Sequence, residues 1–80
     1  MTLQILLFGI TTDLLGTSTI EVNLTDNTTV ADLKSILKTK YVALKNLKSY
    51  AVAVNETYAS DDVILKTNDI VAIIPPVSGG

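Results

Sequence analysis

The 80-residue chain contains no cysteine and no histidine. Without cysteine it has no disulfide, no thiolate nucleophile and no cysteine-based metal site. Without histidine it lacks the side chain that most often acts as a general base or metal ligand near neutral pH. Its serines have no histidine to activate them, which excludes a serine-nucleophile triad. The sequence therefore predicts no catalytic apparatus and no metal site within the chain.

Long apolar runs and basic residues are also scarce. No segment approaches the roughly 20 apolar residues that a membrane span requires. The N-terminus begins as a strand and not as a signal peptide, so we expect a cytoplasmic protein with no membrane partner. Four of the six basic residues (Lys34, Lys38, Lys40 and Lys45) fall near one predicted helix, but the net charge is −2 and aromatic residues are few. We interpret them as a solvated helix surface and expect no nucleic-acid partner.

The acidic residues and glycines offer no site of their own. Asp61 and Asp62 are adjacent in a predicted exposed turn, so their carboxylates should not converge on a metal ion or on acid–base chemistry. Gly9 and Gly16 lack the spacing of a phosphate-binding loop. What the chain has in excess is apolar surface, since 48% of its residues are hydrophobic and its mean hydropathy is +0.43. This surplus belongs either to a core or to a surface that meets a partner.

The spacing of apolar residues predicts four strands and one main helix. Alternation at every second position indicates strands over residues 2–8, 18–24, 50–54 and 70–74. Thr29 is placed to cap a helix, and Asp32 three residues on approximates a capping box. Lys34 and Lys38 are expected to face away from the helix's apolar stripe. That stripe recurs at spacings of three and four and consists of Val30, Leu33, Ile36, Leu37 and Tyr41.

Shorter elements are predicted in the connections. Residues 11–15 are expected to form a helical turn that Gly16 ends in a left-handed conformation. A second short helix is expected around Leu44 and Leu47, and Asn55 is a turn residue. Residues 63–65 are predicted to form a short buried segment.

The order of these elements predicts an α+β fold of the β-grasp (ubiquitin-like) type, a mixed sheet with one main helix packed across one face. The last strand would lie beside the first, in the middle of the sheet. We expect a β-grasp domain over residues 1–74 and an extended C-terminal tail over residues 75–80. Alternation would point one set of side chains at the helix, namely Leu3, Ile5, Leu7, Val71 and Ile73.

The predicted tail is Pro75-Pro76-Val77-Ser78-Gly79-Gly80. The prolines favour extended backbone, and the glycines have no Cβ, so the tail would be a stiff lead with a thin tip. Its reactive group is the carboxylate of Gly80. A carboxylate that attacks the α-phosphorus of ATP gives an acyl-adenylate, whose carbonyl sulfur or an amine can then capture. A terminal Gly-Gly is also compatible with an inert, frayed end.

Several motifs give the chain a family resemblance over essentially its whole length. They are Leu7-Phe8-Gly9, Asp13-Leu14-Leu15-Gly16, Thr29-Val30 with Leu33, Val52-Ala53-Val54-Asn55, and the stretch from Asn68-Asp69 through Val71-Ala72-Ile73-Ile74 to the Pro-Pro-Val-Ser-Gly-Gly tail. The chain resembles the ubiquitin-like sulfur-carrier family and, within it, the small subunits of molybdopterin synthases. The family's usual glycine before the aspartate is Asn68 here, a residue that also tolerates a left-handed turn.

The resemblance implies a function and partners. In such proteins an E1-like (MoeB-like) adenylyltransferase uses ATP to activate the terminal glycine, here Gly80, which becomes a thiocarboxylate. A MoaE-like large subunit then receives the tail, and sulfur passes to cyclic pyranopterin monophosphate in molybdenum cofactor biosynthesis. A heterotetramer of two small and two large subunits is expected. No permanently bound cofactor is implied.

The resemblance and the alternation together imply a partner interface. Phe8 and Ile74 fall on the sheet face opposite the helix, and Tyr58 joins them by analogy with the family's partner surface. Three other functions stay open at this stage. They are sulfur carriage for thiamine or tRNA thiolation, ubiquitin-like modification of proteins through Gly80, and a plain interaction module with an inert tail.

Overall fold

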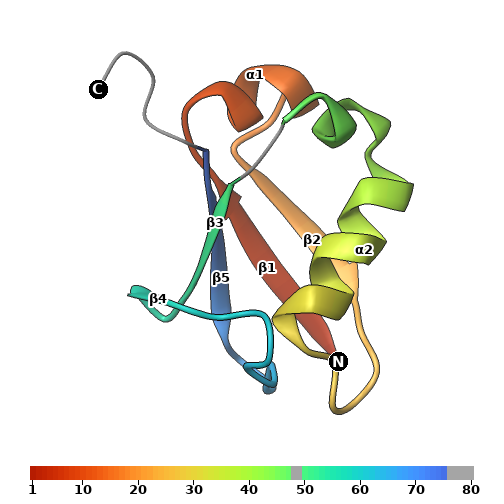
Figure 1. Cartoon of the computed structure of the whole chain (residues 1–80), viewed down its shortest axis with the longest axis vertical. Helices are drawn as coiled ribbons and strands as arrows, with labels where there is room; N and C mark the ends of the chain where they lie inside the picture. Colours follow the sequence, from red (N-terminus) through yellow and green to blue (C-terminus); the bar gives the residue numbers. More distant parts are fainter. Residues whose placement is uncertain (48–49, 76–80) are drawn as a thin grey trace.

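A five-stranded mixed sheet carries one main helix across one face (Figure 1). The computed structural model describes residues 1–47 and 50–75. The strands are β1 (Thr2–Leu7), β2 (Thr19–Asn23), β3 (Ala51–Val54), β4 (Thr57–Tyr58) and β5 (Ile70–Ile74), in the order β2-β1-β5-β3-β4. β1 pairs antiparallel with β2 and parallel with β5, which pairs antiparallel with β3. The last strand thus lies beside the first in the middle of the sheet, and the predicted β-grasp fold is confirmed.

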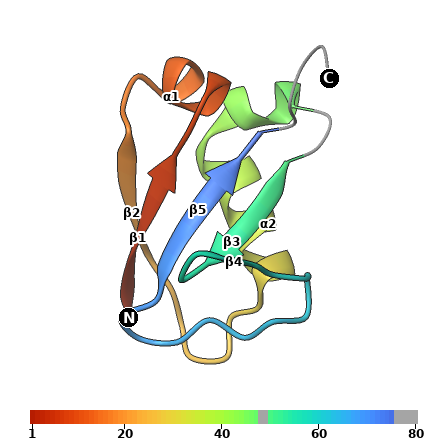
Figure 2. The same ribbon diagram turned by 90° about the vertical axis from the view of Figure 1, so that its left-hand side faces the viewer.

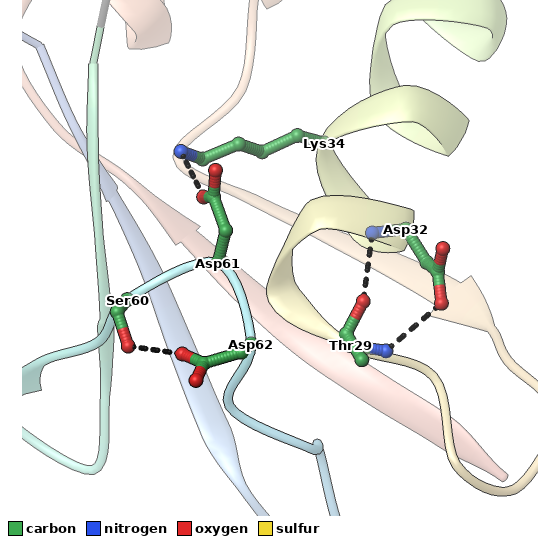
Figure 3. Close-up of polar contacts among 6 residues, drawn as sticks. All are labelled: Thr29, Asp32, Lys34, Ser60, Asp61 and Asp62. Carbon is green, nitrogen blue, oxygen red and sulfur yellow. Dashed lines mark hydrogen bonds and ion pairs between the residues drawn. The ribbon is translucent and has the colours of Figure 1, made fainter.

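The start of α2 and the end of α1 have residues whose local chemistry suits a cap. Before α2 (Val30–Lys40), the Thr29 hydroxyl accepts from the Asp32 N–H and Asp32 Oδ2 accepts from the Thr29 N–H, both at 3.2 Å (Figure 3). This is the predicted capping box. Gly16, at φ 71°, ends α1 (Ile10–Leu15) in the left-handed conformation that glycine adopts without strain. A 3₁₀ helix, η1 (Val42–Asn46), follows α2 where a second short helix was predicted.

The core lies between the sheet and α2. Alternate residues of β1 and β5 are at most 3% exposed, and α2 contributes three side chains that are 0% exposed. Each such side chain gains about 1.5–3 kcal/mol from leaving water, so this layer is the main source of stability. The buried side chains of these three elements are Leu3, Ile5, Leu7, Val30, Leu33, Leu37, Val71 and Ile73. The predicted alternation is therefore confirmed for β1 and β5.

Three side chains differ from the sequence-based expectation. Ile64 is 49% exposed, so the prediction of a buried segment over residues 63–65 is wrong at its centre, because extended backbone turns Leu65 inward and Ile64 outward. Ile36 lies at the margin of the α2 stripe and is 37% exposed. Lys34 does not point freely into water, since its Nζ is 2.8 Å from Asp61 Oδ1 and 5.8 Å from the centre of the Tyr50 ring.

The predicted bounds of three strands need correction, and a fourth strand was not predicted. β1 ends at Leu7, which leaves Phe8 just outside the strand, and β2 and β3 are each shorter than predicted. β4, only two residues long, was not predicted, because alternation cannot be recognised in so short a segment.

In the parts of the chain that the structure describes, no helix is long and apolar enough to cross a membrane.

Candidate functional site

The face of the sheet opposite α2 holds an apolar hollow. Figure 2 shows this face toward the viewer, with α2 behind the strands. The hollow has a volume of about 320 Å³. Its lining comes from four strands, the end of β1 and the β3–β4 turn, and consists of Leu6, Phe8, Ala53, Glu56, Tyr58, Ile70, Ala72 and Ile74. Most of this lining is apolar, so it resembles a surface that meets another protein more than a site for chemistry.

The register of the strands explains the shape. Leu6 pairs with Ala72 across β1 and β5, Ala72 pairs with Ala53 across β5 and β3, and Ala53 pairs with Tyr58 across β3 and β4. One row of side chains therefore crosses four strands with two alanines at its centre. Because an alanine side chain is a single methyl group, the centre of the row is low and the larger side chains stand around it.

Large apolar side chains around the hollow are left in water. Phe8 is 49% exposed, Ile70 51% and Tyr58 71%. Exposed single apolar residues are ordinary, but several that border one concave surface form a contiguous patch. Covering this patch would gain about 25 cal/mol per Å² of apolar area, which favours association with a partner.

Thr11 fixes the backbone of Phe8. Its hydroxyl accepts from the Phe8 N–H at 3.0 Å and donates to the Phe8 carbonyl at 2.5 Å. The Thr12 hydroxyl donates to the Leu7 carbonyl at 3.1 Å. Thr11 is 0% exposed, so these bonds also satisfy a buried polar group. Sequence analysis placed Thr11 in a helical turn and missed this role, which depends on a contact back to the end of β1.

Gly9 packs closely against Pro75, the last residue that the structure describes. Gly9 has φ 56° and ψ −135°, a combination that essentially only glycine adopts. A Cβ built on Gly9 would lie 3.0 Å from Pro75 Cγ. The missing side chain therefore lets Pro75 pack onto the β1–α1 connection beside Phe8. This contact fixes where the chain leaves the sheet, at the edge of the apolar hollow.

The turn between β3 and β4 is tied to the start of β5. Asn55, with φ 52°, donates from Nδ2 to Asp69 Oδ1 at 2.9 Å, and its Oδ1 accepts from the Ile70 N–H at 2.9 Å. The Asn55 N–H donates to the Ile70 carbonyl at 2.8 Å. These bonds hold the hairpin that carries Tyr58 against the strand that carries Ile70. They give a structural reason for Asn55 and Asp69 within the motifs quoted above.

The acidic pair has separate partners. Asp61 pairs with Lys34, whereas Asp62 accepts from the Ser60 hydroxyl at 2.5 Å (Figure 3). The Ser60 hydrogen bond, with a smaller backbone contribution, lowers the pKa of Asp62. Burial, and then the nearby Asp61 carboxylate, raise the pKa of Tyr50. Within residues 1–47 and 50–75 no group of three acidic side chains is placed to hold a metal ion. We interpret the pKa shifts of Asp62 and Tyr50 as effects of their immediate neighbours and not as signs of a catalytic or metal site.

The structure brings Phe8, Tyr58 and Ile74 together around one hollow and places Pro75 at its edge. The further tail residues predicted as functional, Pro76, Val77, Ser78, Gly79 and Gly80, lie outside the described residues. The predicted division into domain and tail therefore stays a prediction. Sequence analysis missed several residues that shape the site, namely Leu6, Gly9, Thr11, Ala53, Glu56 and Ile70. The period of two assigned Leu6 to this face but gave no sign that it bordered a hollow.

Known proteins similar to this chain share one description. The chain is 33% identical over 79 residues to a molybdopterin synthase sulfur carrier subunit of Arabidopsis thaliana, with 98% of this chain and 82% of the relative covered. It is 38% identical over 81 residues to the subunit of that name from Dictyostelium discoideum, with 96% and 94% covered. Among solved structures, SAMP1 of Haloferax volcanii, a small archaeal modifier protein, superposes with a TM-score of 0.87 at 25% identity, and both chains are covered fully.

The family comparison agrees with these relatives. The model of the ThiS family matches residues 5–80, from the middle of β1 to the last glycine. That range includes the second half of β1, the other strands and helices of the fold, the residues that line the hollow and the tail residues. The resemblance to ubiquitin-like sulfur carriers predicted from the sequence is confirmed, and the chain belongs to the ThiS family.

Proposed function

We propose that this chain is the sulfur-carrier small subunit of a molybdopterin synthase. The observation that carries the proposal is the position of Pro75, seated on Gly9 at the edge of the apolar hollow. A surface suited to a partner and the start of the segment that would enter that partner therefore lie side by side. The curated relatives, which are named as sulfur carriers of this synthase, support the same function.

The hollow would receive the large synthase subunit. Six extended residues, from Pro75 to Gly80, span at most about 20 Å. Gly80 can therefore enter an active site of the large subunit only if that subunit docks directly against the domain. The hollow bordered by Phe8, Tyr58 and Ile74 adjoins the start of the tail, because Ile74 immediately precedes Pro75. Two small and two large subunits would make the complete assembly.

The chemistry at Gly80 would proceed in three steps, namely adenylation, thiocarboxylate formation and sulfur transfer. A carboxylate oxygen attacks the α-phosphorus of ATP on an E1-like activating enzyme, pyrophosphate leaves, and an acyl-adenylate forms. Sulfide (HS⁻) released by a sulfur donor then attacks the carbonyl carbon, AMP leaves, and a thiocarboxylate remains. In the synthase this sulfur passes to cyclic pyranopterin monophosphate, and water restores the carboxylate. Gly80 suits each attack because no side chain crowds its carbonyl.

The rest of the chain agrees with a carrier that performs no catalysis of its own. It has six basic residues and no histidine, so it offers little to bind an anionic pterin or to move protons near neutral pH. These tasks would belong to the large subunit and to the activating enzyme. The small subunit would supply the fold, the docking surface and the activated terminus.

An intact-mass measurement tests the carrier function. The purified chain is incubated with the activating enzyme of its own organism, ATP and a sulfur donor, and its mass should rise by the exchange of one oxygen for sulfur. Omission of ATP is the control. A variant without Gly80 should keep the wild-type melting temperature and show no such exchange. An unchanged mass of the wild-type chain under all conditions would contradict the proposal.

The similarity to SAMP1 of Haloferax volcanii favours a second candidate, a ubiquitin-like protein modifier. In that case an amine of a target protein would capture the adenylate of Gly80 in place of sulfur. Incubation of a tagged chain with a lysate, the activating enzyme and ATP would then give adducts larger than the chain, joined through Gly80. Thiocarboxylate formation without such adducts favours the carrier.

A further inference from the structure

Glu56 is a charged residue on an otherwise apolar surface. Of the eight residues that line the hollow, the other seven are aliphatic or aromatic. Within residues 1–47 and 50–75 the structure contains one ion pair, between Lys34 and Asp61. The Glu56 carboxylate forms no ion pair with these residues. Glu56 therefore borders the apolar hollow, and its carboxylate has no cationic partner in the described part of its own chain.

Glu56 has a left-handed backbone conformation that glycine would adopt with less strain. Val54 pairs with Thr57, so Asn55 and Glu56 are the two central residues of a β-hairpin turn. Their φ angles are 52° and 70°, the arrangement of a type I′ turn, for which Asn-Gly is strongly preferred. A side chain with a Cβ is disfavoured at φ 70°. The carboxylate is therefore present at a position where the fold does not require it.

We propose that Glu56 sets the charge specificity of the hollow. It would pair with a lysine or arginine that the large synthase subunit places beside the apolar segment filling the hollow. The inference rests on the proposed function and adds to it the chemistry of the partner surface, apolar at the centre with a cation at one side. Covering the hollow excludes water from the pair, which strengthens the attraction, and a partner with an acidic residue there is repelled.

Charge also argues against a second copy of this chain as the occupant. A two-fold dimer uses the same patch on both subunits, so it would bring the Glu56 carboxylates of both copies into one interface. The net charge of −2 adds to the repulsion. A partner with a complementary cation is therefore favoured over self-association.

Binding to the large subunit of the same organism tests the proposal. The dissociation constant is measured by calorimetry for wild type, Glu56→Gln and Glu56→Lys at about 50 mM and about 300 mM NaCl, where the screening length falls from roughly 14 to 6 Å. Glu56→Gln should weaken binding about 3- to 10-fold at low salt and less at high salt, as expected for a pair at the border of an interface. Glu56→Lys should weaken it by more than about 30-fold, because like charges then meet.

Two controls separate this role from general effects. Glu21 lies on the same sheet face, on edge strand β2, and does not line the hollow. In the order of the sheet, β2 is three strands from β3 and four from β4, so Glu21 is roughly 14–19 Å from the turn that carries Glu56. Glu21→Gln makes the same charge change and should leave affinity within about twofold of wild type. Glu56→Gly should weaken binding as Glu56→Gln does, while its melting temperature equals or exceeds that of wild type by up to about 4 °C.

The outcomes distinguish the two proposals. If wild type binds and Glu56→Gln binds equally well at low salt, the role of Glu56 is refuted while the proposed function stands. Equal losses for Glu21→Gln and Glu56→Gln would refute it as well, because general charge attraction would then explain both. If wild type does not bind the large subunit, the proposed function and the role of Glu56 both fail. A loss confined to the Glu56 variants that shrinks with salt supports the proposal.

Discussion

Phe8→Asp should separate docking from folding. Phe8 is 49% exposed, so about half of its ring is already in water. Full burial of such a side chain is worth about 1.5–3 kcal/mol, and removal of the buried half should therefore cost about 1 kcal/mol. For a domain of this size the melting temperature should fall by roughly 4–8 °C. The fold should persist, because Thr11 bonds to the Phe8 backbone and does not depend on the ring.

The effect on binding should be larger. In a complex with the large subunit the exposed half of the ring would be buried, which gives about 1 kcal/mol of binding energy that the variant lacks. An aspartate in the same place would be covered without a partner, at a further cost of several kcal/mol. A total loss of at least about 3 kcal/mol corresponds to a dissociation constant more than 100-fold higher.

Ile64→Asp is the matched control. Ile64 has the same exposed fraction as Phe8, 49%, but it does not line the hollow. Both variants are compared with wild type by size-exclusion chromatography with the large subunit, by calorimetry and by thermal denaturation. Ile64→Asp should lose similar stability and keep its affinity. Wild-type complex formation by Phe8→Asp, or an equal loss of affinity in both variants, would refute the assignment of the hollow as the docking surface.

Three further predictions concern the elements that support the site. Gly9→Ala should lower the free energy of unfolding by about 1–3 kcal/mol, because it places a Cβ at φ 56° and close to Pro75 Cγ. Adding Pro75→Ala should recover part of this loss, and melting-temperature shifts that simply add up in the double variant would contradict the contact. Thr29→Ala should cost about 1 kcal/mol through the lost cap of α2, measured by urea denaturation; an unchanged midpoint would show that the capping box contributes nothing. Stability should fall as the pH rises above about 10, because burial and Asp61 raise the pKa of Tyr50 in the folded chain, so the unfolded chain releases the Tyr50 proton first. In Tyr50→Phe the loss of stability with pH should be shallower, and a pH profile identical to that of wild type would contradict the raised pKa.

The sequence was informative where a local interaction follows a recognisable residue pattern. The capping box at Thr29 and Asp32 and the left-handed end of α1 at Gly16 depend on residues within three or four positions of each other, so their chemistry is readable from the chain. Alternation likewise identified the buried side of β1 and β5. The β-grasp topology followed from the order of these elements and from the family motifs.

Sequence reasoning failed where no recognisable residue pattern marks the contact. Thr11 is only three positions from Phe8, but its hydroxyl meets both backbone groups of Phe8 only because the chain turns after β1. β4 is only two residues long and exists because it pairs with β3. Tyr58 was assigned to the interface by family resemblance, since no periodic pattern surrounds it. Ile64 was expected to be buried because an apolar run does not show which of its residues faces out.

The sequence by itself determined the lack of cysteine and histidine, the elements with strong periodicity, the family resemblance and the Pro-Pro-Val-Ser-Gly-Gly composition of residues 75–80. Only the tertiary structure decided that Leu6, Ala72, Ala53 and Tyr58 form one row across four strands. The physical reason is that the hollow depends on strand register, which is set by hydrogen bonds between residues far apart in the chain. A shift of one residue in any strand would turn its lining side chains to the other face. The same register brings Glu56 beside the hollow and Pro75 to its edge.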